Sequence, residues 1–236
     1  MEHPVVCWLI PCYNVPDINW MRSCIASLHS QNIYWQAVIV DDGSTDPKIW
    51  EQLYQYSQLD NRITAVRAEH GGVARALNTA YSVAKQMEES RGITHYARID
   101  VDDYNDHDRL VKQVAFMKAH EVGLVGAGMR VDWGHGLVDI KLGCDSDPIE
   151  YLKHKHTPCF HPTWLIAKES MMPYSEDYPH AEDIAWLCTY LRKGGKLANY
   201  PDPLITKRQH PERVSSVYKE IQIQSRERAV KEILGE

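Results

Sequence analysis

Short apolar runs alternate with stretches of helical spacing through the first 130 residues. The runs predict buried strands at Val5–Ile10, Ala37–Val40, Ile63–Val66, His95–Ile99 and Leu124–Val131. The stretches between them predict helices at about 21–30, 47–59, 72–87 and 107–120, with Asp46 and Asp106 as candidate N-caps. Strands that alternate with helices in this way predict an α/β fold with a doubly wound, mostly parallel sheet.

The second half of the chain has a less regular pattern. It contains loops rich in glycine and histidine, a helix over about 181–192, two short strands near 197–207 and a charged C-terminal helix. Because repeats and low-complexity linkers are missing from the sequence, we expect one domain over residues 1–236.

Composition and charge indicate the class of protein and disfavour one class of binding partner. With 44% hydrophobic and 25% charged residues the chain is typical of a globular protein. A net charge of -6 disfavours nucleic acid as a partner. The start of the sequence lacks the pattern of a signal peptide and no apolar run is long enough for a membrane span, which favours a cytoplasmic protein. Six cysteines without a paired spacing are expected to be free thiols: Cys7, Cys12, Cys24, Cys144, Cys159 and Cys188.

Acidic residues follow two of the predicted strands, at the edge where parallel sheets bind ligands. If the backbone is extended there, Asp100 and Asp102 point the same way and converge. Paired carboxylates are ligands for Mg²⁺ or Mn²⁺, although an Asp-rich turn that only caps a helix has the same sequence. After the second strand, Asp41 is expected to face the ligand crevice, whereas Asp46 before Pro47 is expected to cap a helix.

Several short motifs occur in a fixed order along residues 4–215: Ile10-Pro11-Cys12-Tyr13-Asn14, Val40-Asp41-Asp42-Gly43-Ser44-Thr45-Asp46, Arg98-Ile99-Asp100-Val101-Asp102-Asp103, Asp108-Arg109-Leu110 with Gln113, His161-Pro162-Thr163, Ala181-Glu182-Asp183 and Arg208-Gln209-His210. In content and spacing this series resembles the family 2 inverting glycosyltransferases of the GT-A fold. The resemblance implies a nucleotide-sugar and metal half over about 1–130 and an acceptor half over about 131–236.

The resemblance also implies roles for individual residues. Pro11 and Tyr13 would border the nucleobase and Asp41 would accept the N3–H of uracil, with Arg75 and Asn78 beside base and ribose. Asp100 would lie at the ribose and the metal, with Asp102 as principal metal ligand. The late His210 would complete the metal or diphosphate site. On the acceptor side Asp183 would be the general base, and Glu182 and His161 are weaker candidates for contact with the acceptor. For His161, the satisfaction of a backbone group is the alternative.

These roles predict a metal-assisted transferase. A sugar would pass from a nucleoside diphosphate donor, most simply a UDP-sugar, to a hydroxyl of a glycan or lipid-linked acceptor with inversion. A carboxylate base activates a poor hydroxyl nucleophile, and Mn²⁺ or Mg²⁺ stabilises the charge on a leaving diphosphate. The interleaved charges of the tail favour a helix that packs back on the domain, and a peripheral membrane contact is the alternative.

Other functions fit the sequence less well. A sugar-nucleotide nucleotidyltransferase would need a glycine-rich, basic loop after the first strand, and a dehydrogenase would need Gly-x-Gly-x-x-Gly there. A non-catalytic nucleotide-sugar-binding protein would not need the carboxylates at 100, 102 and 183. A zinc site among His154, His156, Cys159 and His161 has no second ligand pair of known spacing.

Overall fold

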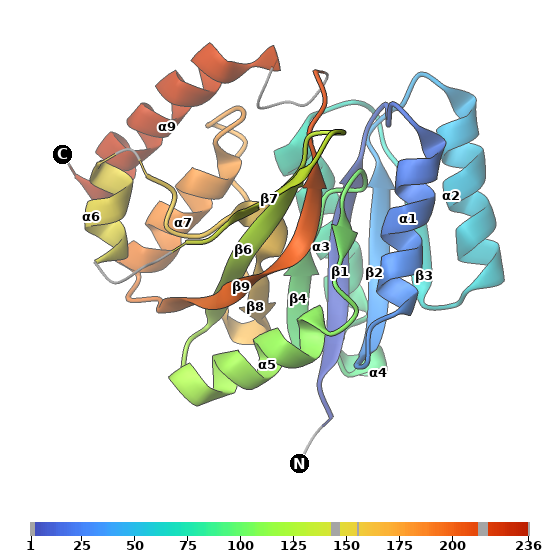
Figure 1. Ribbon diagram of the computed structural model, residues 1–236, viewed down its shortest axis with the longest axis horizontal. Helices are drawn as coiled ribbons and strands as arrows, with labels where there is room; N and C mark the ends of the chain where they lie inside the picture. Colours follow the sequence, from blue (N-terminus) through green and yellow to red (C-terminus); the bar gives the residue numbers. More distant parts are fainter. Residues whose placement is uncertain (1–2, 143–146, 155, 212–216, 236) are drawn as a thin grey trace.

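A mixed sheet runs through the centre of the molecule (Figure 1). The computed structural model describes residues 3–142, 147–154, 156–211 and 217–235, so Cys144 lies outside the described residues. Within these residues the strand order is β3-β2-β1-β4-β8-β6-β9-β5, and β7 pairs with β6. The strands are β1 Val5–Cys12, β2 Tyr34–Asp41, β3 Ile63–Arg67, β4 His95–Arg98, β5 Tyr104–Asn105, β6 Leu124–Asp132, β7 Leu137–Ile140, β8 Leu165–Ala167 and β9 Leu197–Arg208.

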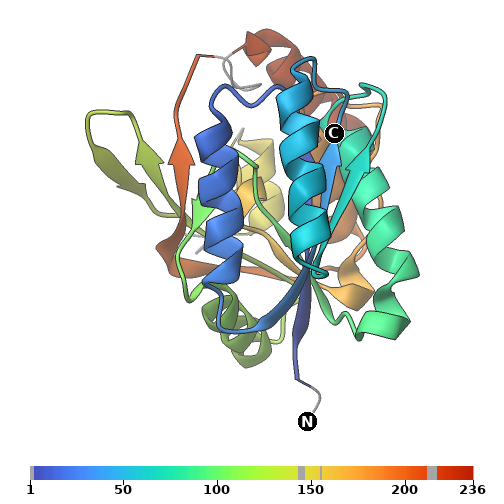
Figure 2. The ribbon, with the colours of Figure 1, turned by 90° about the vertical axis from the view of Figure 1, so that its right-hand side faces the viewer.

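Helices cover both faces of the sheet. The pleat of β1 shows the division, because Val6, Trp8 and Ile10 pack in one core and Cys7 and Leu9 in the other. The first core includes α1 Ile18–His29, α2 Pro47–Leu59 and α5 Arg109–His120, and the second includes α3 Val73–Gln86 and α7 Glu182–Arg192. Figure 2 shows α1 and α2 side by side over one face. The shorter helices are α4 Glu88–Arg91, α6 Pro148–Lys153, η1 His161–Thr163 and η2 Lys168–Ser170.

The predicted α/β fold is confirmed, and the structure corrects several details. β1 to β4 are parallel as expected, but β8 is antiparallel to both β4 and β6. The two short strands expected near 197–207 are one strand, β9, whose register against β6 shifts around Gly128. Pro203 lies opposite Gly128. Because proline cannot donate a hydrogen bond to a neighbouring strand, the sequence pattern suggests that the strand ends there.

The N-cap predictions had different outcomes. Asp46 Oδ1 accepts a hydrogen bond from the Lys48 amide at 3.0 Å, so Asp46 caps α2 as predicted. The prediction for Asp106 was wrong. α5 begins after Asp108, and an Asp106 carboxylate oxygen lies 3.2 Å from Nη1 of Arg130.

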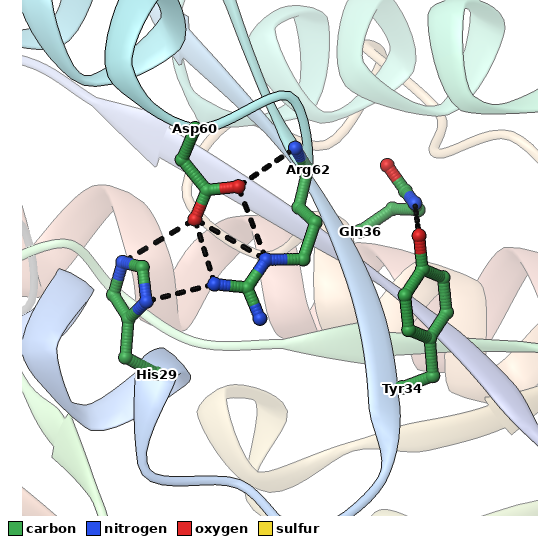
Figure 3. A network of polar contacts seen from close by, with 5 residues as sticks. All are labelled: His29, Tyr34, Gln36, Asp60 and Arg62. Atoms are coloured by element: carbon green, nitrogen blue, oxygen red, sulfur yellow. Dashed lines mark hydrogen bonds and ion pairs between the residues drawn. The ribbon is translucent and has the colours of Figure 1, made fainter.

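A polar network ties helices to strands at the amino-terminal edge of the sheet, opposite the acidic loops (Figure 3). Asp60 Oδ2 accepts from Nη2 of Arg62 at 2.8 Å and lies 3.6 Å from Nε2 of His29. The Arg62 guanidinium also lies 4.1 Å from the centroid of the Trp35 ring. Because these contacts join α1, α2, β2 and β3, the network stabilises the framework at a distance from the chemistry.

The C-terminal helix α9, Lys219–Leu234, packs back on α7, as predicted (Figure 1). Ala229 and Val230 are buried in this contact, while Ile221 and Ile223 are exposed. In the described parts of the chain, no helix has both the length and the apolar composition to cross a membrane.

Candidate active site

The loops that follow β1 and β2 are locked together. Asn14 Oδ1 accepts from the amide of Thr45 at 2.9 Å and from its hydroxyl at 3.1 Å, and Ser44 Oγ accepts from the Asn14 amide at 3.0 Å. Asn14 has φ of 43°, a left-handed conformation that asparagine tolerates better than most residues. The two loops therefore form one rigid rim at the carboxyl ends of the strands.

Asp41 lies at the end of β2 and is completely buried. Its Oδ1 accepts from the Ser44 amide at 3.0 Å. Its Oδ2 has no hydrogen-bond partner among the described residues, and the nearest cation is Nε of Arg67 at 3.6 Å. A buried carboxylate oxygen without a donor is costly unless a ligand supplies one, so the geometry suits Asp41 to accept an N–H.

Asp42 organises the loop before α3. Its two oxygens accept from the amides of Gly71 and Gly72 at 2.9 and 2.8 Å, and Oδ2 lies 2.9 Å from Nδ1 of His70. The His70 ring stacks on Tyr13, with centroids 4.2 Å apart and planes 20° apart. Neither Asp42 nor His70 could be recognised from the sequence, since a second acid beside Asp41 and an isolated histidine carry no signal of this contact.

The remaining residues expected beside the nucleoside lie in different surroundings. Pro11 is partly buried and pairs in register with Val40. Arg75 is exposed on α3 and its side chain covers Gly71, where a Cβ would lie 2.3 Å from Arg75 Cδ. Asn78 Oδ1 accepts from the Tyr174 amide at 2.8 Å, and its Nδ2 donates to the Tyr174 carbonyl at 2.9 Å. Both polar atoms of Asn78 therefore hold the 174 segment against α3.

Three carboxylates converge after β4. Oxygens of Asp100, Asp102 and Asp103 lie within 4.8 Å of one another. The extended backbone expected here was wrong, because the Asp103 amide donates to the Asp100 carbonyl at 3.1 Å and closes a turn. The turn brings a third acid, Asp103, into the cluster. Three acids this close repel one another, so the cluster suits a divalent cation.

The end of β9 closes over the acidic turn. The Arg208 amide donates to Asp103 Oδ1 at 2.9 Å, and Nη1 of Arg208 donates to the Asp102 carbonyl at 2.5 Å. Nε2 of His210 lies 2.9 Å from Asp102 Oδ2. The other ring nitrogen of His210 is buried and has no hydrogen-bond partner in the described residues. The structure thus brings together two residues that the sequence separates by 108 positions.

Arg109 of α5 is a buried arginine whose hydrogen bonds to the described residues all go to neutral groups. Arg109 donates to Asn105 Oδ1 at 2.7 Å, to Gln113 Oε1 at 2.9 Å and to the Trp164 carbonyl at 3.3 Å. Burial lowers the pKa of Arg109 to about 9. These bonds join α5 to the segment before β8, so Arg109 and Gln113, which belong to one of the motifs of the sequence, support the site.

Arg98 connects the acidic turn to the second half of the chain. It is 3% exposed, and its Nη2 donates to Asp100 Oδ1 at 2.8 Å. Nearby, Nε2 of His161 shares a hydrogen bond with the Tyr174 hydroxyl at 2.9 Å. Burial, together with the Arg98 charge, holds the pKa of His161 well below its usual range, so this ring is neutral. Nε2 of His161 is therefore paired with a side chain, the Tyr174 hydroxyl.

Glu182 and Asp183 form the first turn of α7, where helix amides favour negative charge. Burial, and then the charge of Asp183, raises the pKa of Glu182 from 4.5 to about 7. Burial also raises the pKa of Asp183, against a hydrogen bond from the Ile184 amide at 2.8 Å. The charges of Arg98, Glu182 and Asp183 all act on the pKa of buried Tyr174. The Arg98 charge also lowers the pKa of both acids.

The chain is similar in sequence to known proteins. The family described as Glycosyl transferase family 2 matches residues 7–165. An uncharacterized glycosyltransferase of Haemophilus influenzae is 25% identical over 235 residues, which is 91% of this chain and 68% of the relative. The O-antigen biosynthesis glycosyltransferase WbnJ of Escherichia coli is 29% identical over 155 residues, which is 61% of this chain and 58% of the relative. The chain thus spans only part of each relative.

Two solved structures share the fold across almost all of the chain. TarS 1-349 of S. aureus, in complex with UDP, has a TM-score of 0.66 and 19% identity over 97% of this chain and 70% of that chain. The mannosyltransferase PcManGT of Pyrobaculum calidifontis, in complex with GDP-Man and Mn²⁺, has a TM-score of 0.68 and 17% identity, over 100% of this chain and 65% of that chain. At these identities the likeness establishes the architecture and leaves the substrates open.

Proposed function

Because the chain belongs to glycosyltransferase family 2, we propose that it transfers a sugar from a nucleoside diphosphate donor to an acceptor hydroxyl, with inversion. One observation carries the proposal. The carboxylates of Asp100, Asp102 and Asp103 converge at the strand ends, where Asp100 pairs with buried Arg98, and the Arg98 charge also lowers the pKa of Glu182 at the start of α7. This arrangement supports a donor site at the acidic cluster and a base site at the start of α7, with the Arg98 charge acting on both.

We propose a uracil base for the donor. Asp41 Oδ2 is buried without a hydrogen-bond donor among the described residues, which supports a role in accepting the N3–H of uracil. Tyr13 supplies an exposed ring beside it, stacked on His70. One structural neighbour was solved with UDP and another with GDP-Man, so guanine is the base against which this preference is tested.

The acidic cluster fits a divalent cation, Mn²⁺ or Mg²⁺. Three carboxylates within 4.8 Å of one another are a hard oxygen donor set, and Asp102 with His210 would hold the ion. When bound, such an ion stabilises negative charge on a diphosphate leaving group. Arg208 positions this ligand set, because it fixes the backbone of Asp102 and the carboxylate of Asp103.

Asp183 is the proposed base. The acceptor hydroxyl donates its proton to the Asp183 carboxylate as the oxygen attacks the anomeric carbon, opposite the departing diphosphate. Its raised pKa makes the carboxylate a better proton acceptor than an exposed aspartate. Glu182 neighbours the base and has a pKa of about 7. Below that pH Glu182 is mostly protonated, so Glu182 and Asp183 do not both carry a negative charge. The acceptor is a glycan or a lipid-linked saccharide.

The test is Asp183→Asn, which keeps the shape of the side chain and removes the proton acceptor. We expect donor affinity within about 3-fold of wild type and transfer slowed by about 10²- to 10⁴-fold. Asp177→Asn, at an exposed position in the segment before α7, is the matched control and should transfer at the wild-type rate. Transfer by Asp183→Asn at the wild-type rate, or product NMR with a retained anomeric centre, would refute the mechanism.

A further inference from the structure

The C-terminal helix lies along α7 in the same direction. Near its beginning, the Tyr218 ring stacks on His180 with centroids 4.2 Å apart. Near its end, the Ile233 carbonyl accepts from Nη1 of Arg192 at 2.8 Å. Figure 1 shows the two helices side by side, with α6 beside them. The first half of α9 therefore lies beside the turn of α7 that carries the proposed base.

One side chain of α9 reaches across this contact. Nη2 of Arg226 donates to the His156 carbonyl at 2.6 Å and to the Leu152 carbonyl at 3.4 Å, and Nη1 donates to Thr157 Oγ1 at 3.3 Å. All three acceptors are neutral, so within the described residues no carboxylate binds this guanidinium directly. A half-buried positive charge in such a position lowers the pKa of a nearby acid.

We propose that Arg226 is a positioning residue for Asp183: it ties the end of α6 and the segment 156–157 to α9, beside the first turn of α7, and its charge stabilises the ionised form of the base. The inference rests on the proposed role of Asp183. It assigns to the C-terminal helix a part in the acceptor side of the site, although this helix lies beyond the part of the chain matched by the family.

The charges around Asp183 come from three elements. Glu182 lies in the same turn of α7, Arg98 comes from β4 and Arg226 from α9. Burial raises the pKa of Asp183, while Arg226 and Arg98 lower it. In return, Asp183 raises the pKa of Arg226 against the effect of burial. The charge of Asp100 raises the pKa of Glu182. Cys188, one turn further along α7, raises the pKa of Arg226.

The test compares Arg226→Gln with Arg226→Lys over the pH–rate profile of transfer. Loss of a nearby positive charge raises the pKa of a carboxylate. In Arg226→Gln we expect the acidic limb of kcat/KM to move up by about 0.5 to 1 pH unit, with donor affinity unchanged. Lysine keeps the charge, so Arg226→Lys should restore the limb to within about 0.3 pH unit of wild type.

Two further variants control for the loss of an arginine. Arg228→Gln removes a half-exposed arginine from the same helix, and Arg62→Gln removes the centre of the distant network in Figure 3. Neither should move the acidic limb. An equal loss of rate at every pH in Arg226→Gln, or a lysine variant as impaired as the glutamine variant, would overturn the proposal. Full activity of Asp183→Asn would instead refute the base itself, whatever Arg226 does.

Discussion

The raised pKa of Glu182 predicts a specific dependence of stability on pH. Glu182 is 9% exposed, and its pKa rises from 4.5 to about 7 on folding. An acid whose pKa is raised in the folded state stabilises the fold below the lower value, and this contribution is lost as the pH rises through the higher one. A tenfold change in proton affinity corresponds to ~1.4 kcal/mol. The shift of Glu182 therefore corresponds to roughly 3 kcal/mol of stability that disappears between these two pH values.

Glu182→Gln should remove this dependence. Glutamine has nearly the shape of the protonated acid, so the variant and the wild type should be about equally stable at about pH 5. At about pH 8 the wild type carries a buried charge and the variant does not, and we expect the variant to be more stable by roughly 3 kcal/mol. Urea unfolding at a series of pH values, followed by tryptophan fluorescence, measures the difference; Trp186 of the same helix is a buried reporter.

Glu51→Gln is the matched control, because Glu51 is an exposed glutamate on another helix. Its stability should follow that of the wild type at every pH. Parallel curves for Glu182→Gln and the wild type would refute the reasoning, since burial of Glu182 would then have no cost at neutral pH. If Glu182→Gln is more stable than the wild type at about pH 8, the native glutamate lowers the stability of the fold at the first turn of α7. Such a loss of stability is common at functional sites.

Three further outcomes are expected. Asp102→Asn should weaken UDP binding in the presence of Mn²⁺ by at least about 10-fold; calorimetry with Mn²⁺ and with EDTA checks this, and equal wild-type affinity in both conditions would rule out the metal. Competition by UDP and GDP should favour UDP in the wild type and lose that preference in Asp41→Asn, whereas tighter GDP binding by the wild type would contradict the base site. Asp60→Asn should lower the free energy of unfolding at neutral pH by about 1–2 kcal/mol. Because Arg62 holds the pKa of Asp60 below 3.8, this difference should vanish as the pH falls through that lowered pKa, and a difference that persists in urea unfolding at low pH would contradict it.

Local patterns were sufficient to predict the parallel half of the fold and the positions of its acids. β1 to β4 are short apolar runs that end at polar or turn-forming residues. A carboxylate at the end of such a parallel strand lies at the edge where ligands bind, independently of how the remaining strands are arranged. The antiparallel β8 could not be predicted in this way. Its three residues are too few to show a period, and its pairing with β4 and β6 joins residues 70 and 40 positions away in sequence.

The positions of the candidate site residues were predictable from local signals, whereas the contacts between them were not. Asp102 and Asp183 lie at positions that a strand end and a helix start define. By contrast, Asn78 is of a residue type that often binds ligands, but both of its side-chain polar atoms form hydrogen bonds with the Tyr174 backbone. Arg98 follows apolar residues in β4, and the sequence gives no sign of its ion pair with Asp100. Such contacts depend on distances that only the folded chain fixes.

The pairing of β9 with β6 has a consequence for the order in which function is acquired. His210 reaches Asp102 across 108 positions of sequence, and it does so only after β9 has been synthesised and added to the sheet. A ribosome-bound chain that ends before β9 can form the Asp100–Asp103 turn but has no histidine beside it. The proposed ligand set would therefore be complete only after β9 has joined the sheet, and contacts of such long range are the ones that close slowly during folding.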